Sequence, residues 1–280
     1  MSKLSVISQE NPILLIGCGK MGSAMLSGWL DQGIDQQAML IVDPYLEGIK
    51  NSFPELSKNQ LHETIATLPK KITPSFVIMA VKPQMMDQAL GELKSRELSS
   101  AVILSVAAGK TIFSFADQLG KEQAIIRAMP NTPAAIGKGI TVCCANELVS
   151  QNHKEVCTKL LETVGAVEWI DDETLMDSVT ALSGSGPAYV FYLVEAMAAA
   201  GESIGLPGEL SKKLARQTVS GAGALLDVSD EKASKLRENV TSPGGTTAAA
   251  LDVLMSDEGL AKILRRAMIE AKNRSKELAS

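Results

Sequence analysis

A short apolar run followed by three closely spaced glycines constrains the fold of this chain more than any other feature. Residues Ile13–Ile16 predict a buried strand, glycines follow at positions 17, 19 and 22, and the stretch 23–30 predicts a helix. In such a unit the first glycine permits the turn, the second lets the backbone approach a pyrophosphate, and the third lets the helix pack on the strand. The helix N-terminus adds free N–H groups and partial positive charge. A bare turn also uses glycines, but the strand before and the helix after favour a dinucleotide site formed by Gly17, Cys18, Gly19, Lys20, Met21 and Gly22.

A second apolar run, Met39–Val42, ends at Asp43. This acid lies about 20 residues beyond the last glycine, where a dinucleotide-binding unit places the carboxylate that binds the adenosine ribose. Asp43 is therefore a candidate coenzyme-binding residue, and a nicotinamide or flavin nucleotide is the expected ligand.

Predicted strands and helices alternate through the first part of the chain. Further apolar runs that predict strands cover residues 76–81, 101–106, 124–128, 140–144 and 166–170. Predicted helices cover residues 84–96, 112–119 and 150–163. This alternation predicts an α/β fold, a Rossmann-type doubly wound and mostly parallel sheet with helices on both faces.

The alternation stops at Asp171, and no convincing strand follows. Helices are expected over 174–182, 188–201, 207–228 and 247–278, with breaks at Ser183–Pro187, Gly205–Pro207 and Ser242–Gly245. We therefore expect a dinucleotide-binding domain over residues 1–170 and an all-α domain over residues 171–280. The predicted helix over 188–200 is apolar nearly all round, so it lies either at the centre of the helical domain or under a second subunit. A helical domain of about 110 residues with so much apolar surface favours a dimerisation domain.

Composition narrows the possible functions. A net charge of −5 with no basic face argues against nucleic acid as the main partner. The four cysteines lack zinc-ligand or redox spacing and are expected to be reduced, buried thiols; no metal site is expected, and His62 and His153 are expected at the surface. No apolar run precedes Ile13 or is long enough to span a bilayer, so we expect a cytoplasmic protein that is not bound to membranes.

Two loops at the C-terminal ends of predicted strands are candidates for coenzyme contacts, because ligands of open sheets bind at that edge. The second contains Asn131 between two prolines; its carboxamide can both donate to and accept from nicotinamide, with an Asx turn as the alternative. The first loop consists of Ala80, Val81, Lys82 and Pro83. Its alternative interpretation is a strand end followed by a solvated lysine.

Two further loops lie in the predicted helical domain. Ser183–Pro187 is best explained as a break between helices. Ser242–Thr247 places paired glycines directly before a helix, where successive N–H groups form a concave anion nest; helix capping explains one threonine but not the glycine pair. A carboxylate site is expected there. Since no arrangement suits acyl or phosphoryl transfer, a nucleotide site plus a carboxylate nest predicts hydride chemistry on a small acid.

Together these motifs resemble the pyrroline-5-carboxylate reductase family over nearly the whole chain. The resemblance rests on Ile16–Gly22, Ala80–Pro83, Arg127–Pro133, Leu182–Tyr189 and Ser242–Thr247. It implies reduction of 1-pyrroline-5-carboxylate to L-proline, the last step of proline biosynthesis, by NADPH or NADH. It also implies a homodimer with the substrate near the dimer interface, and larger rings of such dimers, including decamers.

The resemblance also implies roles for individual residues. The glycine turn would hold the pyrophosphate, and Ala80–Pro83 with Asn131 would line the nicotinamide. Backbone N–H groups of 244–246 would bind the substrate carboxylate, and Thr247 would hydrogen-bond the ring nitrogen as the catalytic residue. The substrate-binding residues implied are Ser242, Gly244, Gly245, Thr246 and Thr247.

One position departs from the family pattern. Relatives often carry Ser, Thr or Asn after the second strand, followed by a basic residue, whereas this chain has Asp43, Pro44 and Tyr45. A carboxylate accepts hydrogen bonds from ribose hydroxyls but repels a 2′-phosphate, which favours NADH. Lys50 offers compensating charge, so NADPH stays open.

Several alternatives remain at this stage. The chain could be a non-catalytic NAD(P)H sensor, or a reductase of another small cyclic imine acid, such as a six-membered one. A β-hydroxy-acid reductase would use a lysine on the inter-domain helix, but none lies between Ala166 and Glu209. A methyltransferase would not need the helical half.

Overall fold

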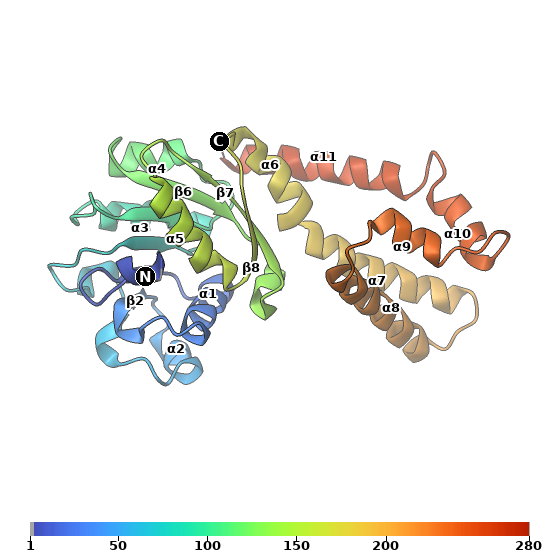
Figure 1. Ribbon diagram of the computed structural model, residues 1–280, viewed down its shortest axis with the longest axis horizontal. Coiled ribbons are helices and arrows are strands. Elements are labelled where there is room, and N and C mark those ends of the chain that lie inside the picture. Colours follow the sequence, from blue (N-terminus) through green and yellow to red (C-terminus); the bar gives the residue numbers. More distant parts are fainter. Residues whose placement is uncertain (1–2, 280) are drawn as a thin grey trace. The chain divides into compact units, whose positions relative to one another are not determined.

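In the computed structural model, which describes residues 3–279, eight strands form one sheet (Figure 1). Their order is β3-β2-β1-β4-β5-β6-β7-β8, and every neighbouring pair is parallel except β6 and β7. The strands are β1 (Ile13–Ile16), β2 (Met39–Val42), β3 (Leu61–His62), β4 (Phe76–Met79), β5 (Val102–Ser105), β6 (Ala124–Met129), β7 (Gly139–Ala145) and β8 (Gly165–Trp169). The predicted doubly wound, mostly parallel sheet is confirmed.

Alternate residues of the central strands enter two apolar cores, one on each face of the sheet. Leu15 faces one core and Leu14 the other, because successive side chains of a strand point to opposite faces. One core is covered by α1 (Lys20–Asp31), α2 (Leu46–Ser52) and α5 (Gln151–Glu162), the other by α3 (Met86–Leu93) and α4 (Ile112–Leu119). The buried Trp29 joins α1 to α5, since its ring N–H donates to the Leu160 carbonyl at 2.9 Å.

The cysteines and histidines lie largely inside. All four cysteines are free and buried, and Cys143 and Cys144 face different cores, as expected for neighbours on a strand. The expectation that both histidines lie at the surface is wrong. His62 and His153 are half-buried, and the His153 ring packs edge-on against Phe76 with ring centroids 6.5 Å apart.

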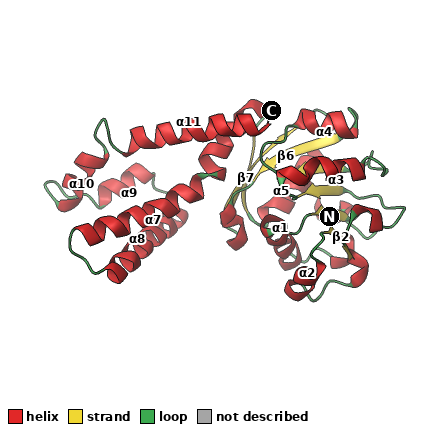
Figure 2. Ribbon diagram, turned by 180° about the vertical axis from the view of Figure 1, so that it is seen from behind, coloured by secondary structure: helices red, strands yellow, loops and turns green. Residues whose placement is uncertain are grey.

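Helices follow β8 to the end of the described chain (Figure 2). They are α6 (Met176–Val179), α7 (Gly186–Ser203), α8 (Gly208–Val228), α9 (Ala233–Asn239), α10 (Thr246–Leu254) and α11 (Leu260–Ala279). The single helix expected over 247–278 is wrong: the chain turns tightly between α10 and α11, and a Cβ at Gly259 would lie 2.3 Å from the Leu254 carbonyl oxygen. Helix α9 was not expected.

The break expected at Ser183–Pro187 is also wrong. A π-helical turn, Thr180–Gly184, follows α6, and Ser185 keeps a right-handed helical conformation into α7. Pro187 fits because it lies in the first turn of α7, where its missing N–H loses no intrahelical bond.

The chain divides into two compact units. Unit 1 holds the described residues of Met1–Gly184 and Lys272–Ser280, and unit 2 holds Ser185–Ala271, so α11 contributes to both. The sheet ends near residue 170, but the following segment stays in unit 1, where the buried Met176 packs with Val142 and Cys144.

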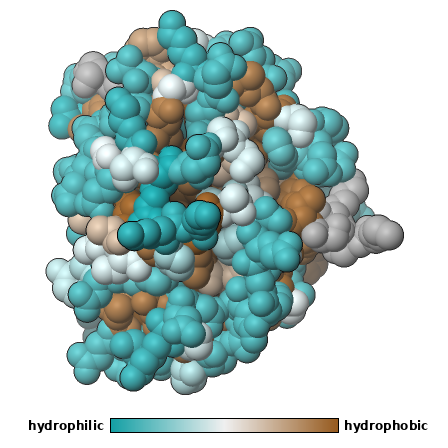
Figure 3. Space-filling view, turned by 90° about the vertical axis from the view of Figure 1, so that its left-hand side faces the viewer, coloured by the Kyte–Doolittle hydropathy of each residue, from teal (hydrophilic) through white to brown (hydrophobic). Residues whose placement is uncertain are grey.

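The two units differ in their surfaces. On the face of unit 1 shown in Figure 3, hydrophilic residues predominate and apolar residues form separate small patches. In unit 2, α7 buries only Ala198, while Phe191 and Tyr192 are 62% and 69% exposed. A helix that is apolar nearly all round is normally buried, and α7 does not reach that burial within its own chain. No helix among residues 3–279 is both long and apolar enough to cross a membrane.

Candidate coenzyme and substrate sites

The turn between β1 and α1 excludes side chains at two of its three glycines. Gly17 has φ +93°, and a Cβ there would lie 2.8 Å from the carbonyl carbon of Ala80. A Cβ at Gly22 would lie 2.2 Å from the Gly17 carbonyl oxygen. No protein atom lies within 4 Å of the Cβ position at Gly19. The fold therefore requires Gly17 and Gly22, whereas the space at Gly19 is free for a ligand.

The first turn of α1 offers open donors beside that space. Gly19 is the N-cap and makes no side-chain cap hydrogen bond. The first N–H with a partner is that of Ser23, which donates to the Gly19 carbonyl, and the Ser23 hydroxyl braces the turn by donating to the Cys18 carbonyl at 2.7 Å. This arrangement fits a pyrophosphate. The N–H groups without a partner in the described chain are those of Lys20, Met21 and Gly22.

Asp43 is fixed beside the turn by two backbone N–H groups. One carboxylate oxygen accepts from Cys18 at 2.7 Å and the other from Tyr45 at 2.9 Å. Burial, and to a smaller extent the Asp43 charge, raises the pKa of the Cys18 thiol, so the thiol stays neutral at neutral pH.

Asp43 lines a pocket of about 350 Å³. The other lining residues are Cys18, Gly19, Ser23, Tyr45, Gly48, Ile49, Ser52 and Phe53, none of which is basic. Lys50, the compensating cation considered from the sequence, is exposed and not among them. The pocket has the place and the carboxylate expected for an adenosine ribose.

The predicted nicotinamide side lies at the same edge of the sheet. Strand β4 pairs with β1, and the N–H of Ala80 donates to the Ile16 carbonyl at 2.8 Å, which places Ala80–Pro83 beside the glycine turn. Ala80 and Val81 are half-buried, and Lys82 and Pro83 are exposed.

Asn131 follows β6, two strands further along the sheet. Its side-chain oxygen accepts from the N–H of Ile140 at 2.9 Å and so ties its loop to β7. The amide NH₂ group is left as the donor that can face a ligand.

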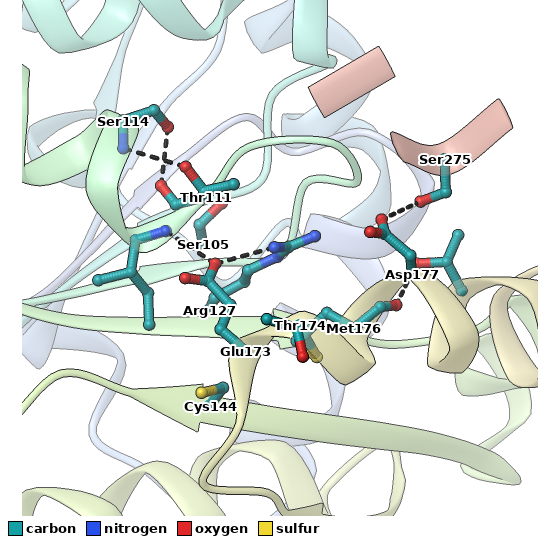
Figure 4. A network of polar contacts seen from close by, with 12 residues as sticks. Ser105, Thr111, Ser114, Arg127, Cys144, Glu173, Thr174, Met176, Asp177 and Ser275 are labelled. Carbon is teal, nitrogen blue, oxygen red and sulfur yellow. Dashed lines mark hydrogen bonds and ion pairs between the residues drawn. The ribbon is translucent and has the colours of Figure 1, made fainter. Parts of the chain in front are cut away.

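Sequence reasoning missed an ion pair at this edge, formed by a buried arginine and a half-buried glutamate (Figure 4). Arg127 in β6 is 5% exposed, and its Nη1 lies 2.8 Å from Oε1 of Glu173. The same carboxylate oxygen accepts from the N–H of Ile112, the first residue of α4, at 2.9 Å. An arginine inside an apolar strand was the available signal, because a buried charge requires a partner.

The predicted carboxylate nest lies in unit 2. Gly244 has φ +69°, and the N–H of Gly245 donates to the Ser242 carbonyl at 3.0 Å, which closes a tight turn before α10. The N–H of Gly245 was expected to bind the substrate carboxylate, but it is already used within the turn. The backbone donors that have no partner in the described chain are that of Gly244 in the turn and those of Thr246, Thr247 and Ala248 in the first turn of α10.

The structure thus gathers the predicted coenzyme residues in unit 1 and the predicted substrate residues in unit 2. In unit 1 the glycine turn, Asp43, Ala80–Pro83 and Asn131 all follow strands β1, β2, β4 and β6 at their carboxyl ends. No group of residues within 3–279 is arranged to hold a metal ion.

Comparisons with known proteins agree with this reading. Residues 173–278 match the family model for pyrroline-5-carboxylate reductase dimerisation, and residues 12–109 match that for NADP oxidoreductase, coenzyme F420-dependent. A pyrroline-5-carboxylate reductase from Pseudomonas aeruginosa is 35% identical over 95% of this chain and 96% of its own.

Solved structures extend the similarity to the fold. A pyrroline-5-carboxylate reductase from Coxiella burnetii superposes with a TM-score of 0.87 at 33% identity, covering 97% of this chain and 99% of that one. The NADP-bound pyrroline carboxylate reductase of Plasmodium falciparum gives 0.78 at 30% identity, with 97% and 99% coverage. Because relatives above 30% identity match almost end to end, this chain belongs to the pyrroline-5-carboxylate reductase family.

Proposed function

We propose that the protein reduces 1-pyrroline-5-carboxylate to L-proline with a nicotinamide coenzyme, the last step of proline biosynthesis. The observation that carries the proposal is the glycine turn, which leaves space at Gly19 beside three unpaired N–H groups, in a chain related along its full length to reductases of this name.

When bound, the reduced coenzyme supplies a hydride to the imine carbon of the substrate. The protein's own contribution is orientation. The open N–H groups of Thr246, Thr247 and Ala248 hold the substrate carboxylate at the N-terminus of α10. The Thr247 hydroxyl hydrogen-bonds the ring nitrogen. A protonated imine already carries the proton that the product amine retains, so no general acid is required, and none of the motifs contains a histidine.

For the coenzyme, we propose that NADH is preferred and that NADPH also binds. The fixed carboxylate of Asp43 accepts from ribose hydroxyls, and the pocket has no basic lining residue to offset a 2′-phosphate. The NADP bound to the Plasmodium falciparum relative supports use of the phosphorylated form within the family.

The proposed assembly is a homodimer formed through unit 2, which supplies cover for the exposed apolar side chains of α7. Rings built from such dimers, decamers included, are the proposed higher assembly. The proposed location is the cytoplasm, where the four free cysteines remain reduced.

The direct test follows the absorbance of NADH and of NADPH separately, with synthetic 1-pyrroline-5-carboxylate, and identifies L-proline by chiral chromatography. We expect imine-dependent oxidation of both coenzymes. At low coenzyme concentration, the rate should be higher with NADH than with NADPH. Coenzyme binding without oxidation would support a sensor instead. Faster turnover of the six-membered 1-piperideine-2-carboxylate would support the other cyclic imine as the substrate.

A further inference from the structure

The loop between β5 and α4 lies between the two predicted nicotinamide contacts. Strand β5 pairs with β4 on one side and with β6 on the other, so residues 106–111 lie between Ala80–Pro83 and Asn131 at the same edge. The N–H groups of Ala108 and Gly109 have no partner in the described chain. Gly109 is buried and has φ +79°. The loop therefore has backbone donors without a partner, and the position of these donors depends on the residues packed around the loop.

One end of the loop is held by Glu173. Its carboxylate accepts from the N–H of Ile112, immediately after the loop, and is itself fixed by the buried Arg127. Figure 4 shows this carboxylate between α4 and β6.

The other contact comes from the C-terminal end of α11, which belongs to unit 1. The hydroxyl of Ser275, which is 6% exposed, donates to Asp177 in α6 at 2.7 Å (Figure 4). One turn later the backbone of Leu278 covers Gly109, so closely that a Cβ on Gly109 would lie 3.1 Å from the Leu278 carbonyl oxygen. Glu173 and Asp177 lie one helical turn apart, so one segment anchors both contacts.

We propose that the end of α11 is a positioning element of the reductase site, with Ser275 as its positioning residue. The hydrogen bond to Asp177 fixes the last turn of α11, that turn fixes the β5–α4 loop, and the loop places the nicotinamide end of the coenzyme. This inference rests on the proposed function.

The test compares four substitutions. Ser275→Ala and Asp177→Ala each remove the hydrogen bond, whereas Asp177→Asn retains an acceptor oxygen. Arg274→Ala is the matched control, because this side chain is 66% exposed and pairs with Glu277 on the same helix. Truncation after Lys276 removes Leu278 while keeping Ser275, and serves if the substitutions at the hydrogen bond prevent folding.

Two measurements separate positioning from general damage. The first is kcat with NADH and 1-pyrroline-5-carboxylate. The second is competitive inhibition by ADP-ribose, which carries the adenosine and pyrophosphate parts but no nicotinamide and so probes only the glycine turn and the Asp43 pocket. We expect Ser275→Ala, Asp177→Ala and the truncation to lower kcat about tenfold, because small misplacements of reacting groups have effects of that order. The inhibition constant of ADP-ribose should stay unchanged, and Asp177→Asn and Arg274→Ala should retain wild-type kcat.

The proposal is overturned if the alanine variants and the truncation keep wild-type kcat. It is also overturned if ADP-ribose binding weakens in parallel with kcat, since the end of α11 would then only stabilise unit 1. An inactive wild-type protein would instead remove the proposed function, which is a separate result.

Discussion

Adding one methyl group at Gly22 or at Gly19 separates the part of the glycine turn that the fold requires from the part that the ligand requires. At Gly22 the new Cβ would lie 2.2 Å from the Gly17 carbonyl oxygen, so the helix must move by about 1 Å away from the strand. At Gly19 the new Cβ meets no protein atom within 4 Å, and its φ of −70° suits any residue.

The two substitutions should therefore change the unfolding free energy by different amounts. Alanine in a helix gains about 1 kcal/mol over glycine, but overpacking against backbone costs more, so we expect Gly22→Ala to lose about 2 kcal/mol of unfolding free energy. For a chain of this size that corresponds to a fall in Tm of roughly 4–8 °C. Gly19→Ala should change the unfolding free energy by less than about 1 kcal/mol, since only an N-cap preference is altered.

Coenzyme affinity, unlike stability, should be affected mainly by the substitution at Gly19. In Gly19→Ala the methyl group occupies space needed by the pyrophosphate, and a loss of about 2 kcal/mol corresponds to roughly 30-fold weaker binding. Differential scanning calorimetry of the free protein and titration calorimetry with NADH measure the two quantities independently. The reasoning is refuted if Gly19→Ala binds NADH as tightly as the wild type does, or if Gly22→Ala is as stable as the wild type.

Three further predictions concern the coenzyme pocket, the substrate nest and the dimer. Asp43→Asn keeps an oxygen acceptor for the Cys18 N–H and removes the charge, so the ratio of kcat/KM for NADPH to that for NADH should rise about tenfold or more in initial-rate assays; an unchanged ratio would remove Asp43 from ribose recognition. Thr247→Ala should lower kcat by roughly 10–100-fold while the Kd for NADH stays unchanged, and wild-type turnover would show that its hydroxyl does not orient the imine. Phe191→Asp places a charge on the exposed apolar face of α7 and should weaken the dimer by about 100-fold in sedimentation velocity; an intact dimer would place the interface elsewhere.

The sheet could be predicted because its strands are continuous apolar runs between glycine and proline turns. Ile13–Ile16 and Phe76–Met79 are buried on both faces, and only a parallel sheet with two helical layers gives such runs cover on each side. The antiparallel direction of β7 carries no such signal, since Ile140–Cys144 reads equally well in either direction.

The helical part was less predictable because helix ends depend on tertiary contacts. Pro187 and two glycines suggested a break, yet the chain passes through a π-turn at Thr180–Gly184, where a Cβ at Gly184 would meet Met129 at 2.4 Å. Gly184 therefore lies in a helical turn and not in a loop. Gly259 gave a real stop signal inside the expected long helix, but Glu258 and Leu260 on either side of it are good helix formers.

In the candidate site, motifs read from sequence located the main-chain cradles but not the side chains that hold them. Gly17 and Gly22 are predictable because only glycine fits, whereas the Arg127–Glu173 pair joins residues 46 positions apart. Asp43 was predicted as a ribose-binding residue, but that it also accepts from the N–H of Cys18 depends on how β1 and β2 pair.

Direct hydride transfer is the central claim, and deuterium labelling tests it most directly. NADH carrying deuterium at C4 in the transferred position is incubated with 1-pyrroline-5-carboxylate and the wild-type protein, and the proline formed is analysed by mass spectrometry and NMR. Direct hydride transfer predicts L-proline with one deuterium at C5 for each NADH oxidised. Unlabelled proline, or labelled coenzyme that is never oxidised in the presence of the imine, would contradict it.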